Sequence, residues 1–154
     1  MEKNELIKAS AYELLEGVVV EGDLSKLSPA QRLEYYRQVC EGLGLNPLTQ
    51  PFEYIKLQGR LSLYATRRAA DQLRRLYGVS IDSMEIRPDN DMAIVTVIGH
   101  DERGRSDTEV GVVSLANLSG DARANAVLKA VTKAKRRLTL SICGLGLLDE
   151  TEVE

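Results

Sequence analysis

Two segments of this sequence concentrate Lys and Arg with few carboxylates nearby. The segment 121–140 holds six basic side chains and one acidic one, and no further Asp or Glu occurs before Asp149. The segment 56–75 likewise holds six basic side chains, opposed only by Asp71. Guanidinium and ammonium groups bind phosphate oxygens through charge-assisted hydrogen bonds. The chemistry that these residues favour is therefore the capture of a phosphate backbone.

The uneven distribution of charge supports this interpretation. Each basic segment has a net charge of +5, whereas the whole chain has −3, which leaves −13 for the other residues. Such segregation is typical of a basic groove on an acidic body, although ordinary solvated helix faces remain the alternative. The side chains expected to contact DNA are Lys56, Arg60, Arg67, Arg68, Arg74, Arg75, Lys129, Lys133, Lys135, Arg136 and Arg137. Tyr54 and Tyr64 are the candidates for stacking on bases.

Helical periodicity predicts the elements that position most of these groups. In the segment 121–146, apolar side chains recur at the spacing of one helical face. They are Val127, Val131, Ala134 and Leu138. Lys129, Lys133, Arg136 and Arg137 are predicted to project from the opposite face. A helix capped by Thr66 and closed by Gly78 repeats the arrangement, with its four arginines turned away from the apolar side.

The remaining pattern predicts an α+β fold in the order α-α-ββ-α-βββ-α. A first helix over 4–16 should end at Gly17, before a short extended piece over 18–20, and Ser28-Pro29-Ala30-Gln31 should start the second helix. A hairpin turns at Gln58-Gly59-Arg60, and strands over 79–86, 93–99 and 107–115 form a meander. The sheet should be largely antiparallel, with helices on one face. We expect one domain: a helical portion 1–44 that could supply subunit contacts, a core 45–148 and an acidic tail 149–154 that could contact a neighbour.

Enzymatic chemistry has little support in these residues. The single histidine, His100, is placed in a turn and cannot build a histidine metal site or a Ser-His-Asp triad. Asp89, Asp91, Asp101 and Glu102 leave open a nuclease that uses Mg²⁺. Otherwise we expect no cofactor and no metal. The absence of long apolar runs and the two cysteines favour a cytoplasmic protein with reduced thiols and no membrane partner.

Two stretches resemble a known family. Gly44-Leu45-Asn46-Pro47-Leu48-Thr49-Gln50 with the hairpin, Leu63-Tyr64-Ala65 and the arginine-bearing helix is similar to the core of RecT and the lambda Red beta protein. The basic final helix, followed by Gly144-Leu145-Gly146 and an acidic D-x-x-E end, is similar to that family's closing pattern. The resemblance spans roughly residues 35–154. These are phage-encoded single-strand annealing proteins.

The resemblance implies an activity without ATP and without bond chemistry. Family members coat single-stranded DNA and hold the nascent annealed duplex in a groove along an oligomeric ring or helical filament. It implies that Arg67 and Arg68 flank this groove and that the final helix grips phosphates. Many members carry a further carboxy-terminal module for host single-strand-binding protein or a partner exonuclease, and this sequence stops before it, so those partners are not implied. The alternatives are a coating protein that does not anneal, the nuclease, and a structural phage component.

Overall fold

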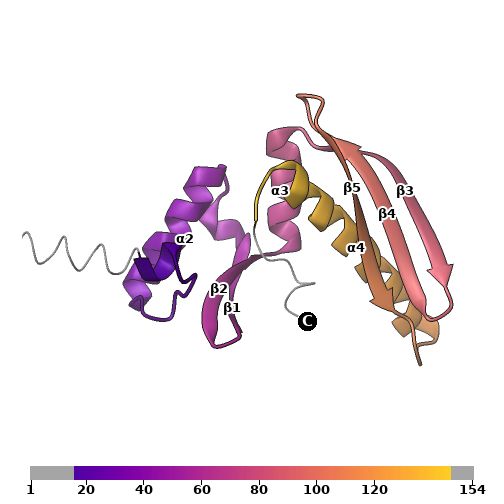
Figure 1. The fold of residues 1–154 in the computed structure, drawn as a ribbon, viewed down its shortest axis with the longest axis horizontal. Helices are drawn as coiled ribbons and strands as arrows, with labels where there is room; N and C mark the ends of the chain where they lie inside the picture. Colours follow the sequence, from indigo (N-terminus) through magenta and orange to yellow (C-terminus); the bar gives the residue numbers. More distant parts are fainter. Residues whose placement is uncertain (1–15, 147–154) are drawn as a thin grey trace, which may run out of the picture.

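A hairpin and a three-stranded sheet, each with its own helices, make up this α+β fold (Figure 1). The computed structural model describes residues 16–146. Its elements are α2 (Pro29–Leu43), η1 (Pro47–Thr49), β1 (Phe52–Leu57), β2 (Arg60–Ala65), α3 (Arg67–Tyr77), β3 (Ser80–Asp89), β4 (Met92–His100), β5 (Ser106–Ser114) and α4 (Gly120–Ile142). The predicted class and element order are confirmed.

The start of the chain departs from the prediction. Residues 16–19 are helical, and the backbone N–H of Val20 donates to the Glu16 carbonyl at 2.8 Å. Gly17 therefore does not end a helix, and 18–20 is not extended, because a glycine is tolerated inside a helix at a modest cost. The rest of the helix predicted over 4–16, and the acidic tail 149–154, lie outside the described residues.

Local sequence signals set the ends of α2 and the turn of the hairpin. The Ser28 hydroxyl accepts from the Gln31 N–H at 3.2 Å, and the Gln31 side chain accepts from the Ser28 N–H at 2.9 Å. This is the predicted capping box. Between β1 and β2, Gln58 and Gly59 both have positive φ, at 51° and 75°. Two such residues form the tight turn whose twist suits a two-residue hairpin.

The three-stranded sheet has the order β3-β4-β5, all antiparallel, and α4 covers one face of it (Figure 1). Inward-facing residues of β4 alternate with outward-facing ones, so Ala93, Val95 and Val97 are buried against the helix. Strands β3 and β4 are longer than predicted: Arg87, Pro88 and Asp89 continue β3, β4 begins at Met92 and ends at His100, and the turn between them consists of residues 90–91 alone. Pro88 is accommodated because β3 is an edge strand.

Two hydrophobic clusters form the interior. The first core cluster joins the sheet to α4 through Val95, Val97, Ala130, Ala134 and Leu138, among others. The second core cluster joins α2, the hairpin and α3 through side chains that include Cys40, Phe52, Leu63, Ala69 and Leu73. Leu140 of α4 belongs to the second cluster, and Cys143 packs against both. The carboxy-terminal part of α4 thus connects the two clusters.

Both cysteines are free thiols, and burial raises the pKa of each. Among the helices of residues 16–146, none combines the length and the apolar character needed to cross a membrane.

The loop before α2 is fastened to the hairpin by Asp23. Its carboxylate accepts from the N–H groups of Ser25 and Leu61, both at 3.0 Å, and the adjacent Leu24 N–H donates to the Leu61 carbonyl at 2.8 Å. These hydrogen bonds lower the pKa of Asp23 to about 2.

Because the folded-state pKa lies below the ordinary aspartate value of about 4, the contribution of Asp23 to stability is present above pH ~4 and is lost as the pH falls toward 2. We expect Asp23→Asn to flatten this part of the acid stability profile, measured by urea unfolding at a series of pH values. An unchanged slope between the variant and the parent would contradict the assignment.

Candidate nucleic-acid interface

A groove runs between α3 and α4 and brings the two basic segments together. The cavity has a volume of about 390 Å³. Its walls are Arg67, Ala70, Asp71 and Arg74 from α3, and Leu128, Val131, Thr132, Lys135 and Arg136 from α4. Four cationic side chains and one carboxylate therefore line a single concave surface, although the two helices are more than forty residues apart in the sequence. This groove is the part of the expected interface that the structure brings together.

Asp71 is the acidic member of the groove. Its carboxylate lies 2.6 Å from Arg74 Nη2 and 3.6 Å from Arg67 Nε, as expected for residues three and four apart on a helix. The Arg67 side chain remains 72% exposed, so its pair with Asp71 is a surface ion pair of small net strength. A phosphate in the groove could therefore compete with Asp71 for this guanidinium.

The solvent-facing position predicted for Lys133 and Arg136 is wrong. Their relative exposures are only 7% and 2%, and Thr139 and Leu140 beside them are buried as well. The side of α4 opposite the sheet is not open, because α3 packs on it and Leu140 enters the second core cluster. Arg136 still contributes to the groove wall, but Lys133 does not line it.

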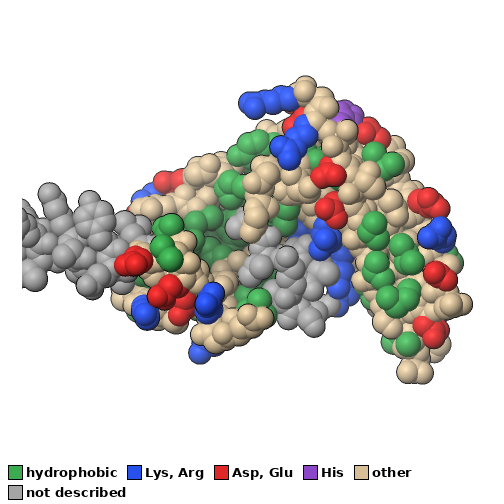
Figure 2. All heavy atoms as spheres, in the orientation of Figure 1, with side chains coloured by type: hydrophobic (Ala, Val, Ile, Leu, Met, Phe, Trp, Pro, Cys, Tyr) green, Lys and Arg blue, Asp and Glu red, His purple; other side chains and the backbone are tan. Residues whose placement is uncertain are grey.

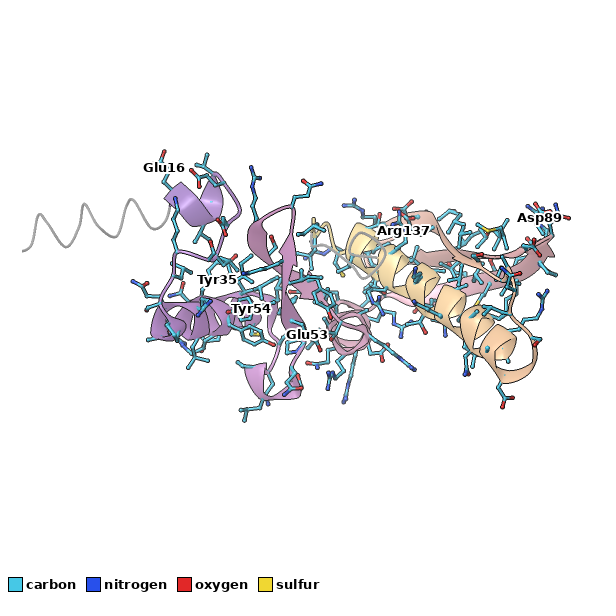
Figure 3. The ribbon with its side chains drawn as sticks, turned by 90° about the horizontal axis from the view of Figure 1, so that it is seen from below. Glu16, Tyr35, Glu53, Tyr54, Asp89 and Arg137 are labelled. Carbon is cyan, nitrogen blue, oxygen red and sulfur yellow. The ribbon has the colours of Figure 1, made fainter. Side chains whose placement is uncertain are left out.

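Four other predicted contacts lie outside the groove. Arg137 Nε is 3.4 Å from Glu109 of β5, so this side chain is directed to the sheet (Figure 3). Arg68 Nη2 is 3.9 Å from Glu53 of the hairpin. Lys129 and Arg75 are exposed and do not line the groove. Fewer of the predicted basic residues therefore line one common surface than the sequence suggested.

The hairpin does not extend the groove. Lys56 and Arg60 are exposed on β1 and β2, beyond the residues that line the cavity. The hydroxyl of Tyr54 donates to the Arg32 carbonyl at 2.7 Å, and its ring packs 6.0 Å from the ring of Tyr36. On the opposite face of the hairpin, the Tyr64 hydroxyl donates to Glu53. The structure therefore does not bring the two candidate stacking rings together.

The carboxylates considered for a nuclease are also separated. Asp89 ends β3 and Asp91 lies in the β3–β4 turn, whereas Asp101 and Glu102 follow β4 at its other end. The hypothesis of one metal site made from all four residues is therefore wrong. His100 is not in a turn but ends β4, where Nδ1 lies 2.8 Å from the Asp82 carboxylate. Within residues 16–146, no three His, Cys, Asp or Glu side chains are grouped closely enough to hold a metal ion.

Sequence reasoning missed the uncharged part of the groove. Leu128, Val131 and Thr132 form the α4 wall between the cationic groups, and Ala70 lies on the α3 wall. The spacing of Arg67, Asp71 and Arg74 did contain a signal, since i,i+3 and i,i+4 positions on a helix are neighbours. Nothing local indicated that Leu128, which is 63% exposed, would border a groove.

Comparison with known protein families finds no match to this chain, and no curated protein is significantly similar to it.

Proposed function

We propose that this protein binds single-stranded DNA in the groove between α3 and α4 and promotes the annealing of complementary strands without ATP. The observation that carries the proposal is the convergence of Arg67, Arg74, Lys135 and Arg136 on one concave surface. The resemblance to phage annealing proteins of the RecT and Red beta type supports the same activity. No bond is made or broken in annealing, so the proposed role is that of a binding protein and not of an enzyme.

The geometry suits contact with a sugar-phosphate backbone. Cations on both walls can neutralise phosphates, and none of the described residues that line the groove is aromatic, so binding there does not depend on base stacking. Base edges would then remain available to a second strand. One domain covers few nucleotides, so we propose that assembly into a ring or filament supplies affinity through many weak contacts.

The test is the affinity of the full chain for a fluorescent oligonucleotide over a series of salt concentrations. Arg67→Ala/Lys135→Ala removes one cation from each wall and should raise the dissociation constant about tenfold at low salt. The slope of log affinity against log salt should fall in magnitude by roughly 0.7 for each lost phosphate contact, independently of base sequence.

A matched control is Lys26→Ala/Arg103→Ala, which removes the same two charges from exposed positions outside the groove. Circular dichroism should show both double variants folded. Equal loss of affinity in both variants would mean that net charge, and not the groove, sets binding.

Annealing itself is tested by mixing two complementary labelled strands with the protein and no nucleotide cofactor. The proposal requires faster pairing than the strands achieve alone, and it requires the groove variant to lose that acceleration. Tight binding with inhibited pairing would instead identify a coating protein.

A further inference from the structure

One face of the three-stranded sheet is left uncovered by the described residues, 16–146. α4 packs on the other face, where Val95 and Val97 are buried, so the outward-facing residues of β4 and β5 meet solvent. We call this uncovered surface the outer sheet face. Its large apolar side chains include Met92, Ile98, Val110 and Val112, which are 37–43% exposed, together with the partly buried Ile94. Figure 2 shows hydrophobic side chains gathered on this part of the molecule, bordered by charged ones.

The strand register makes these residues one continuous patch. Ile94 is opposite Val112, Thr96 opposite Val110, and Ile98 opposite Thr108. Contiguous apolar patches of this kind, with a polar rim, mark interaction surfaces more often than isolated exposed residues do.

The rim along β3 carries charges of both signs. Glu85 is opposite Thr96 and Arg87 is opposite Ile94, so both share the outer face with the apolar patch. Neither forms an ion pair with another described residue. Two unlike charges thus stand two positions apart on the same face of one strand.

We propose that the outer sheet face docks a second copy of the chain, sheet against sheet. The register aligns Ile86, Val95 and Gly111 in a row across the three strands. A two-fold axis parallel to this row, midway between the two sheets, would set each strand antiparallel over the same strand of the partner. Residues at equal distances on either side of this row then meet. Glu85 lies over the partner's Arg87, and Arg87 over the partner's Glu85.

The apolar residues obey the same relation. Val110 lies over the partner's Val112, and Met92 over the partner's Ile98. The surface is therefore its own complement in both charge and hydrophobicity, which favours a second copy over other occupants. Nucleic acid is disfavoured because Glu85 and Asp89 border the same face. Since α4 lies on the opposite side of the sheet, docking leaves the α3–α4 groove open, and the inference does not depend on DNA binding.

The experiment is sedimentation equilibrium of the full chain without DNA, over about 1 to 200 µM. The parent should reach twice the 17.0 kDa of one chain. Ile98→Asp should raise the dimer dissociation constant at least tenfold, because it places a charge inside the apolar contact. Leu48→Asp is the control, since Leu48 is 90% exposed on η1 and lies away from the sheet, and it should leave the constant unchanged.

Charge reversal tests the two-fold register itself. Glu85→Arg and Arg87→Glu each set like charges opposite one another and should weaken the dimer severalfold. The double variant Glu85→Arg/Arg87→Glu has the net charge of the parent and restores unlike pairs, so it should recover parental dimerisation. A monomeric parent throughout the range would overturn the proposal, and so would a dimer indifferent to Ile98→Asp or a swap that fails to restore it.

Discussion

Replacement of Gly111 by alanine should cost about 3 kcal/mol in the free energy of unfolding. Gly111 lies on the inner face of β5, directly under α4. A Cβ atom at this position would stand 2.3 Å from the Ala130 carbonyl oxygen and 2.6 Å from the Ala134 nitrogen. Both are backbone atoms of a helix and cannot rotate away. The whole helix would have to move from the sheet, which would open the first core cluster.

The measurement is urea unfolding followed by circular dichroism, with the denaturant slope compared between variants. Gly42→Ala is the control. Gly42 lies within α2, and an added Cβ would meet nothing within 4 Å, so alanine there should stabilise by about 0.5–1 kcal/mol. Equal stability of the parent and Gly111→Ala would show that α4 does not rest on this glycine.

Leu138→Ala should have a comparable effect, with a loss of roughly 2–5 kcal/mol. The Leu138 side chain is fully buried in the first core cluster, and its Cδ2 is close to where a Cβ on Gly99 would lie. Truncation removes buried methyl groups and leaves a cavity between α4 and β4, because the neighbouring backbone cannot collapse into the space.

The same urea unfolding experiment tests the Leu138→Ala prediction, with Leu128→Ala as the matched control on α4. Leu128 is 63% exposed, so its truncation should change stability by no more than about 0.5 kcal/mol. A small loss for Leu138→Ala, close to that of Leu128→Ala, would contradict the assigned orientation of α4.

Much of the fold could be predicted because its signals are local. The Ser28 capping box, the Gln58-Gly59 turn and the period of two in β4 each depend on residues a few positions apart. The error at Gly17 arose because a glycine can either end a helix or be tolerated within one. The length of β3 was underestimated because Pro88, which often breaks a strand, is compatible with an edge.

The site was harder to predict because helix periodicity shows on which side of a helix a residue lies, but not which other element packs against that side. It identified the side of α4 that turns away from the sheet, and Arg136 does lie there, but it could not show that α3 packs on that side. It also could not pair Arg137 with Glu109 of β5, or Arg68 with Glu53 of β1, since those contacts depend on the tertiary arrangement. The two basic segments were expected to converge, with Arg68 and Lys133 in one trough. Arg67 and Lys135 do line one groove, but Arg68 and Lys133 do not.

The division of the interior between two clusters has a consequence for motion. Ala69 and Leu73 anchor one wall of the groove in the second cluster, whereas Ala130 and Ala134 anchor the other wall in the first. A slight rotation of the two parts of the molecule built on these clusters, about Leu140, would change the width of the α3–α4 groove without exposing either cluster. If the groove binds DNA as proposed, a narrower groove would fit one strand and a wider groove two, with the packing of each half preserved.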